Sequence, residues 1–270
     1  PSNATGTVSG NITVTYYYKL KEATLTINHY IEGTTDKLSQ TITKSVHWGE
    51  KYTTSPATDI NKNYKLVSTP TNATGIIAGD VTVNYYYSLK EATLTIHHYI
   101  EGTTTKLSES IIKGVNWGEK YTTSPATDIN KNYELVSTPT NANGTIEGDT
   151  TVIYYYKLKE ATLTTHHYIE GTTTELSSTT VKDVHWGDTY TTASAKVDSN
   201  YELVSTPTNA SGTISGNVVV TYYYRLKTAT ITVHHYIQNT TTKLADDVIT
   251  TQKYTTNYST KAATVDTNYE

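Results

Sequence analysis

The side chains best suited to metal or acid–base chemistry in this chain are histidines in adjacent pairs. These pairs are His97-His98, His166-His167 and His234-His235. Each pair follows a run of β-branched residues, so we expect it in a strand, where neighbouring side chains point to opposite faces. Two adjacent histidines on one strand cannot chelate one metal ion, so we expect no metal site. We predict instead that His98 and its equivalents lie at the edge of a core with a hydrogen-bond partner.

An Asp-x-Asn-x-Asn pattern resembles the opening of a calcium-binding loop. It occurs at residues 59–63 and again at 128–132, and a shortened form stands at 198–200. A calcium loop of this kind needs Gly at its sixth position and a bidentate Glu at its twelfth. The first copy has Tyr64 and Pro70 at those positions. We therefore predict a solvated Asx turn at each of these places.

Tryptophan offers another kind of chemistry, because its flat apolar ring with one polar N–H can stack on a sugar. A Trp precedes Gly at three equivalent positions, Trp48, Trp117 and Trp186. The alternative is that these rings fill a core or a junction between domains, where Trp is more often found. The corresponding region of a fourth copy, at 250–254, has no Trp.

Tyrosine is used 25 times, and its most regular use is in triplets. Each triplet lies in a ten-residue stretch of β-branched and aromatic residues, which predicts a strand. These stretches are 12–21, 81–90, 150–159 and 218–227. The alternation of a strand places Val81, Val83, Tyr85, Tyr87 and Leu89 on a core face.

The middle tyrosine of each triplet then faces solvent. These residues are Tyr17, Tyr86, Tyr155 and Tyr223. Exposed Tyr rings in a row are our better candidates for contact with sugars. The alternative is that they pack across strands and simply cover the sheet.

Seven Asn-x-Ser/Thr sequons are candidates for N-glycosylation if the source organism glycosylates such sites. They are centred on Asn3, Asn11, Asn72, Asn143, Asn209, Asn239 and Asn257. Several fall in predicted turns, where an acceptor would be exposed.

The whole chain is built from copies of one block. Matching blocks start at Ala23, Ala92, Ala161 and Ala229, and such self-similarity signals an array of small units that support one another. The predicted boundaries are 1–21 for the C-terminal part of a repeat, 22–90, 91–159 and 160–227 for full repeats, and 228–270 for the N-terminal part of another. The junctions contain no Gly or Pro, which argues against a loose hinge.

A full block is expected to contain four main strands and little helix, because no window shows sustained 3.6-residue periodicity. In the second block, strands are predicted at 92–100, 106–117 and 133–137, with the tyrosine strand last. Residues 119–132 are expected to form a loop. The pattern does not decide whether that loop contains one helical turn. A short extended segment is expected at 145–146.

Composition excludes several function classes. The net charge is −4 with no basic run, so we expect no nucleic-acid partner. No apolar stretch approaches the roughly 20 residues that a membrane span needs, so we expect no membrane insertion. There is no Cys, so disulfide and thiolate chemistry are impossible. No nucleophile elbow, phosphate loop or His-Glu metal motif occurs, so we expect neither a cofactor nor an enzyme.

The combined pattern resembles the mucin-binding-protein (MucBP) repeat of Gram-positive surface adhesins. The resemblance is carried by the opening strand at 94–98, a Gly-Glu-Lys-Tyr step at 118–121, a Tyr-Glu-Leu-Val step at 133–136, an Asn-Ala-x-Gly turn and the final Val-x-Val-x-Tyr-x-Tyr strand. It implies small ubiquitin-like β-grasp domains strung as a stalk, some of which bind mucin glycans. The chain departs from the family where His29, His98, His167 and His235 replace a frequent aromatic residue, and no wall-sorting motif is present.

We therefore expect a mainly β fold, a tandem array of small β-grasp-like domains forming an elongated rod. The expected function is a rigid stalk segment of an extracellular, cell-surface adhesin. Weak multivalent binding to glycans or glycoproteins on a host or neighbouring cell would accompany it. The alternative is a fibre subunit, in which copies of the chain assemble end to end through their incomplete terminal repeats.

Overall fold

The computed structural model describes residues 1–270 and contains strands, turns and loops but no helix. The chain divides into two compact units. Unit 1 comprises Pro1–Tyr99, Thr103–Thr127 and Ser137–Tyr154, and unit 2 comprises Ile100–Gly102, Asp128–Val136 and Tyr155–Glu270. The predicted repeat at 22–90 lies within unit 1 and the one at 160–227 within unit 2. No element of the structure is a helix that could cross a membrane.

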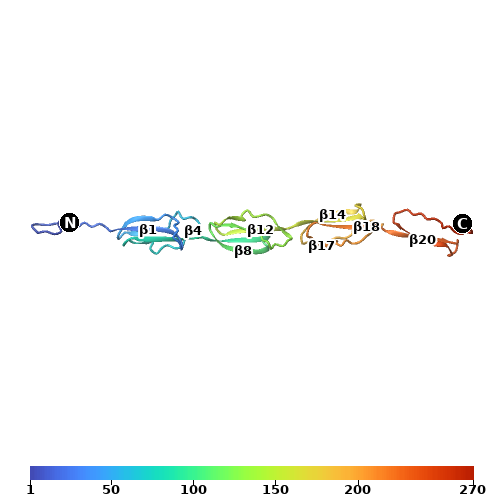
Figure 1. Cartoon of the computed structure of the whole chain (residues 1–270), viewed down its shortest axis with the longest axis horizontal. Coiled ribbons are helices and arrows are strands. Elements are labelled where there is room, and N and C mark those ends of the chain that lie inside the picture. Colours follow the sequence, from blue (N-terminus) through green and yellow to red (C-terminus); the bar gives the residue numbers. More distant parts are fainter. The chain divides into compact units, whose positions relative to one another are not determined.

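The repeat in unit 1 contains six strands. They are β1 (Glu22–Ile31), β2 (Ile42–His47), β3 (Lys51–Thr53), β4 (Tyr64–Leu66), β5 (Thr74–Ile76) and β6 (Val81–Leu89). Two of them, β1 and β4, are labelled in Figure 1. Four strands form a mixed sheet in the order β2-β1-β6-β4, and β3 pairs separately with β5. In the mixed sheet β1 and β6 are parallel, whereas β2 and β4 are antiparallel to their neighbours.

The same pattern recurs along the chain. The second repeat contains β7 (Glu91–Ile100), β8 (Lys106–Asn116), β9 (Lys120–Thr122), β10 (Tyr133–Leu135), β11 (Asn143–Thr145) and β12 (Thr150–Leu158). The third contains β13 (Glu160–Ile169), β14 (Glu175–His185), β15 (Thr189–Thr191), β16 (Tyr201–Leu203), β17 (Ser211–Thr213) and β18 (Val218–Leu226). Their main sheets have the orders β10-β12-β7-β8 and β14-β13-β18-β16. The predicted all-β fold, repeated as small sheets in tandem, is confirmed.

The core of the first complete repeat lies on one face of the central parallel pair. Val83 and Tyr85 have no exposed surface, and Tyr87 is 3% exposed. Leu25 and Ile27 of β1 pack against them. The alternation predicted for the tyrosine strand is thus confirmed at its centre. Leu89 is an exception at 37% exposed, because it ends β6 beyond the residues that the core covers.

Four local predictions for the strands and loops need correction. Residues 119–132 form no helical turn but include the short strand β9, which pairs with β11. The extended segment predicted at 145–146 is strand β11 at Asn143–Thr145. The strand predicted at 133–137 ends at Leu135. The stretch 12–21 repeats the tyrosine-strand sequence but forms no strand, because no neighbouring strand pairs with it.

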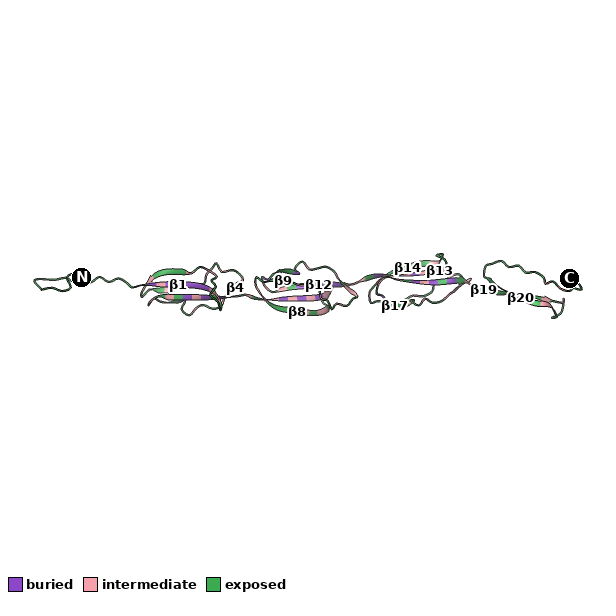
Figure 2. Cartoon of the chain, viewed as in Figure 1, coloured by how far each residue is buried: buried purple, intermediate pink, exposed green.

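The remaining strands are β19 (Thr228–Tyr236) and β20 (Lys243–Lys253), which form a two-stranded antiparallel sheet. No tyrosine strand pairs with β19, and its side chains stay exposed or half-buried. Figure 2 shows the consequence, since buried residues are confined to the complete repeats. A β-strand therefore buries its apolar face in this protein only where both central strands are present.

Candidate functional site

The exposed tyrosines lie on the solvent face of the last strand in each complete repeat. Tyr86 is 40% exposed, Tyr155 39% and Tyr223 44%. In the parallel register Tyr86 stands beside Tyr30 of β1, and their ring centroids are 6.1 Å apart with an interplanar angle of 31°. Together the two rings form an aromatic platform with two phenolic hydroxyls at its edge.

Outward histidines extend this platform in the other two repeats. His97 stacks on Tyr99 at 5.1 Å, and His166 stacks on Tyr168 at 5.1 Å. In the third repeat Tyr168 is also in register with Tyr223. The sequence predicted His97 to be on the solvent face but gave no reason to group it with the tyrosines. The missed signal is the i, i+2 spacing of His and Tyr, which places both rings on one face of a strand.

Polar side chains occupy the same place in the first repeat. Asn28 donates from Nδ2 to Asn84 Oδ1 at 3.0 Å and accepts from Thr41 Oγ1 at 2.8 Å. Asn28 is 6% exposed, and these bonds pair its amide within the fold, so the aromatic rings and not this amide are what the face offers to a ligand. We name the outward residues Tyr30, Tyr86 and their counterparts Tyr99, Tyr155, Tyr168 and Tyr223 the tyrosine face.

Tyr17 differs from its three counterparts. It is 93% exposed, and the residues around it form no strand. The structure thus presents Tyr17 as an isolated exposed ring without a neighbouring platform.

The tryptophans lie at the junctions between successive repeats. Lys90 Nζ is 4.4 Å from the centroid of the Trp117 ring, and the backbone N–H of Trp117 donates to the backbone carbonyl of Lys90 at 2.9 Å. Lys21 and Lys159 cover Trp48 and Trp186 in the same way, at 4.5 Å and 4.4 Å. A cation over the ring occupies one of the faces that a sugar would use.

The inward histidines are core residues. His29 has no exposed surface, stacks on Tyr85 at 5.3 Å, and its Nδ1 is 3.1 Å from the Tyr87 hydroxyl. His167 lies equivalently, with its Nδ1 3.1 Å from the Tyr224 hydroxyl. The predicted hydrogen-bond partner is present at both places, whereas the predicted position at the edge of the core is wrong, because His29 is 0% and His167 5% exposed. His29 Nε2 is buried and has no hydrogen-bond partner.

Burial decides the ionisation of these groups. Loss of solvation lowers the pKa of His29, against a smaller opposing effect of the Asp59 charge. Burial likewise lowers the pKa of His167, and it raises the pKa values of Tyr87 and Tyr224. The core histidines are therefore neutral at pH 7, since a protonated ring would be a buried charge.

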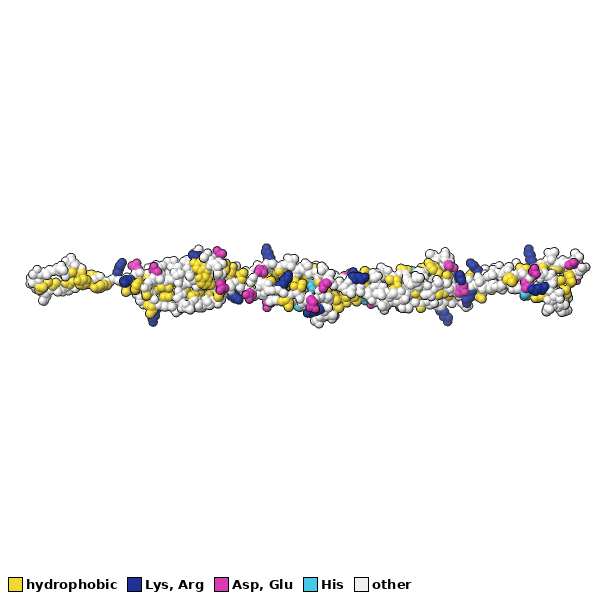
Figure 3. Space-filling view, turned by 60° about the horizontal axis from the view of Figure 1, so that its bottom comes forward, with side chains coloured by type: hydrophobic (Ala, Val, Ile, Leu, Met, Phe, Trp, Pro, Cys, Tyr) yellow, Lys and Arg dark blue, Asp and Glu magenta, His cyan; other side chains and the backbone are white.

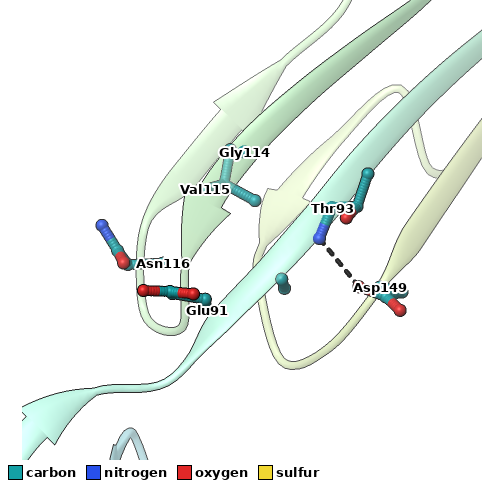
Figure 4. A pocket seen from close by; sticks show the side chains of 7 residues that line it. Glu91, Thr93, Gly114, Val115, Asn116 and Asp149 are labelled. Carbon is teal, nitrogen blue, oxygen red and sulfur yellow. Dashed lines mark hydrogen bonds between the residues drawn. The ribbon is translucent and has the colours of Figure 1, made fainter.

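A shallow pocket of about 500 Å³ lies at the start of β7 (Figure 4). Glu91 and Thr93 of β7, Asn116 of β8 and Asp149 are among the residues that line it. Asp149 Oδ1 accepts a hydrogen bond from the Thr93 N–H at 2.8 Å, as Figure 4 shows. In the third repeat Asn217 accepts the same bond at 2.9 Å. The Asp149 carboxylate therefore acts as a hydrogen-bond acceptor for a backbone N–H, and the neutral amide of Asn217 has the same role in the third repeat.

The Asx turns predicted at the calcium-like pattern are present. The N–H of Asn63 donates to Asn61 Oδ1 at 2.9 Å, and the N–H of Asn132 donates to Asn130 Oδ1 at 3.0 Å. No group of three or more His, Asp or Glu side chains is placed to hold a metal ion.

The sequon asparagines are all exposed. Three of them use their side-chain amide within the fold, donating to backbone carbonyls 10 residues later: Asn3 to Thr13 at 2.8 Å, Asn72 to Thr82 at 2.9 Å and Asn209 to Val219 at 2.9 Å. Glycosylation at any of the seven stays a prediction.

The comparisons with known proteins agree with this description. The family model described as MucBP domain matches residues 24–88, 93–157 and 163–225. Internalin J of Listeria monocytogenes serovar 1/2a is 31% identical over an alignment of 241 residues, and the match covers 85% of this chain and 28% of that protein. Internalin J of serotype 4b is 32% identical over an alignment of 235 residues, and the match covers 83% of this chain and 25% of that protein. The chain thus spans about a quarter of the length of these relatives.

Solved structures with weaker likeness include the Bacillus anthracis TIE protein. It is 13% identical with a TM-score of 0.44, and the match covers 76% of this chain and 51% of the chain of that protein. The type 2 repeat of the mucus binding protein MUB from Lactobacillus reuteri is 14% identical with a TM-score of 0.19, covering 51% of this chain and all of its own. The family matches fall on each of the three complete repeats and together cover most of the sequence, so this chain belongs to the MucBP domain family.

Proposed function

We propose that this chain is a stalk segment of an extracellular, cell-surface adhesin. It would act as a stiff spacer and would also bind mucin-type or other surface glycans weakly at several places. Tandem MucBP repeats occur in surface adhesin-like proteins, and MucBP is not a family of enzymes. The observation that carries the binding role is the tyrosine face, which recurs on every complete repeat.

The chemistry of the tyrosine face suits carbohydrate. A Tyr ring offers flat apolar area to the C–H face of a sugar, and its hydroxyl exchanges hydrogen bonds with sugar hydroxyls. Tyr86, Tyr155 and Tyr223 each leave about two-fifths of their surface exposed. A shallow face of this kind binds weakly, but repetition along one chain converts weak sites into avidity for a glycan-coated surface.

The surface seen in Figure 3 shows no continuous patch of charges of one sign. In the face seen in Figure 3, cationic and anionic side chains are interspersed and apolar side chains reach the surface in several separate patches. The formal net charge of −4 is small for 270 residues. Attraction to a polyanion would need a continuous basic patch, so a neutral or mixed glycan fits this surface better.

The spacer role is supported by the way one strand passes into the next. A single residue, Lys90, separates β6 from β7. Its N–H donates to the Asn63 carbonyl at 2.8 Å, and its carbonyl accepts from the Trp117 N–H at 2.9 Å. Both backbone groups of the linking residue are therefore paired, one on each side of the junction. Lys159 pairs in the same way with Asn132 and Trp186.

Further contacts limit bending at the first junction. Lys62 Nζ lies 2.7 Å from Glu147 Oε1, and this hydrogen bond lowers the pKa of Glu147. The pair is largely exposed, so its contribution to stability is small. Gly118 has a φ of 85°, and a side chain there would collide with the Asn63 amide. This glycine lets the two repeats approach closely.

Binding is tested by removing the tyrosines and keeping the fold. The variant carries Tyr86→Ala, Tyr155→Ala and Tyr223→Ala, and its binding to immobilised mucin and to a glycan array is compared with that of the unchanged chain. We expect a loss of at least tenfold in apparent affinity, because all three complete repeats lose their platform at once. Unchanged circular dichroism would show that the solvent-facing substitutions leave the strands intact.

A matched control separates sugar binding from general stickiness. Ile112→Ala and Val181→Ala remove apolar side chains that are 70% and 61% exposed on β8 and β14. This control should bind mucin as the unchanged chain does. Equal binding by the tyrosine variant would refute the glycan role. Filaments of the pure chain in electron micrographs would favour the fibre subunit instead.

A further inference from the structure

The two strands that connect a complete repeat to its neighbours are adjacent and parallel. In unit 1 the chain enters the repeat through β1 and leaves through β6, and the two strands pair in seven consecutive positions from Leu25↔Val81 to Ile31↔Tyr87. Parallel strands begin at the same end of a sheet. The entry point at Glu22 and the exit at Leu89 therefore lie at opposite ends of this ladder.

Tension applied along the chain would act on this ladder in shear. One end of β1 would be pulled backward while the far end of β6 would be pulled forward, so the strands would have to slide along each other. Sliding loads all hydrogen bonds of the ladder at the same time, whereas peeling breaks them one after another. The rate of forced unfolding is governed by the barrier that must be crossed first, and that barrier is higher in shear.

The ladder is extended beyond its seven paired positions at both ends. The Thr24 N–H donates to Asp80 Oδ1 at 2.7 Å, and the Glu32 N–H donates to the Tyr87 carbonyl at 2.9 Å. In the middle, the Asn28 amide donates to Asn84 at 3.0 Å across the outward face. A slip of one residue would break all three bonds.

Core side chains lock the same pair of strands. His29 of β1 stacks on Tyr85 of β6 at 5.3 Å, and its Nδ1 lies 3.1 Å from the Tyr87 hydroxyl. Sliding by one residue would also turn these rings out of the core, because alternate residues face opposite sides. Backbone and side-chain contacts therefore oppose the same displacement.

The third repeat, in unit 2, has the same arrangement. β13 pairs in parallel with β18 from Leu163↔Val218 to Ile169↔Tyr224. The Glu170 N–H donates to the Tyr224 carbonyl at 2.8 Å, as the equivalent residue does in the first repeat. His167 again stacks on a core tyrosine, Tyr222, at 5.2 Å.

We propose that the first and third repeats are mechanical clamps, which resist unfolding when the protein is pulled by its chain ends. The proposal does not depend on glycan binding, since it concerns the fold alone. The hairpin of β19 and β20 serves as a contrast, because it is antiparallel and has no parallel partner for β19. It would open at low force while the complete repeats stay folded.

The test compares two directions of pulling on one repeat. The chain contains no Cys, so introduced cysteines are the only attachment points for molecular handles. Glu22→Cys with Glu91→Cys loads the two strands in shear. Thr35→Cys with Glu91→Cys pulls both strands from the same end and peels them apart. All three positions are exposed, and both variants use the full chain in optical tweezers at one loading rate.

We expect the mean unfolding force in the shear direction to be at least twice that in the peeling direction. Denaturant melts of the two variants should coincide, which shows that direction and not stability causes the difference. Equal forces in both directions, or a larger force in peeling, would overturn the proposal. The measurement contains no glycan, so its result is independent of the mucin-binding assay.

Discussion

Acid should loosen the first and third repeats, because each contains a buried histidine whose pKa is lowered by burial. In the first repeat the groups around the His29 ring are Tyr85, Tyr87 and the carboxylate of Asp59. Burial lowers the pKa of His29 below its ordinary value, and Asp59 opposes this only partly. The unfolded chain therefore binds a proton at a higher pH than the folded repeat does.

The sign and size of the effect follow from proton linkage. The contribution of His29 to the free energy of unfolding is fully present above the ordinary histidine pKa of about 6.5. It falls as pH drops below that value, because only the unfolded chain takes up the proton. The loss is at most about 1.4 kcal/mol per pH unit and stops once the folded repeat is also protonated. At pH 5, about 1.5 units below, one histidine can remove up to about 2 kcal/mol. That is a large part of the stability of a small domain.

Peptide-resolved hydrogen exchange measures how the stability of one repeat within the full chain depends on pH. The β6 peptide differs in sequence from those of β12 and β18, so the opening free energy of the first repeat is read separately. We expect it to be constant above pH 7 and to fall between pH 6.5 and 5, by no more than about 2 kcal/mol. Intrinsic exchange rates correct for the pH dependence of the chemistry itself.

Two variants in the same repeat decide whether His29 is responsible. His29→Asn keeps a polar group near the Tyr87 hydroxyl but cannot take up a proton. It should be less stable at pH 7 by about 1–3 kcal/mol and lose the acid-dependent fall. His47→Asn removes a histidine that is 44% exposed and should keep that fall. An unchanged acid response in His29→Asn, or its loss in His47→Asn, would refute the reasoning.

Two further predictions concern single residues of the second repeat, and denaturant unfolding measures both. A Cβ on Gly144 would lie 3.2 Å from the Tyr121 ring, whereas one on Gly114 would meet nothing within 4 Å; Gly144→Ala should therefore destabilise by about 1–3 kcal/mol, and Gly114→Ala should be neutral or stabilise by up to about 1 kcal/mol. Equal effects of the two changes would contradict the packing argument. Asp149→Asn should leave stability within about 0.5 kcal/mol, because the third repeat uses Asn for the same bond, whereas Asp149→Ala leaves the Thr93 N–H without its acceptor and costs about 1 kcal/mol. A large loss in Asp149→Asn would mean that the negative charge itself is needed.

Much of the candidate site followed from strand parity. The alternation of the tyrosine strand placed Tyr85 inside and Tyr86 outside, and both placements agree with the observed burial. The inward position of the core histidines followed from the same rule. The alternation of side chains along a strand did not predict which residue of another strand lies beside each side chain. Tyr30 lies beside Tyr86 only because their strands pair in parallel register.

The local sequence also predicted the structure wrongly where a strand has no neighbouring strand to pair with. Residues 12–21 carry the same alternating pattern as β6, yet they form no strand and leave Tyr17 93% exposed. The propensity of β-branched and aromatic residues depends on packing against neighbouring strands. The short strand β9 was missed for the converse reason, since three residues give too little pattern and are fixed by pairing with β11.

By itself the sequence determined the repeat, the all-β character and the faces of the long strands, because these depend on periodicity within about ten residues. Tertiary structure alone decided that the first and last strands of a repeat lie side by side in parallel, with residues 56 positions apart in register. Many pairings satisfy the same alternation, and only the joint burial of both inner faces selects this one. The tyrosine face, the buried histidine and the resistance to shear all depend on that selection.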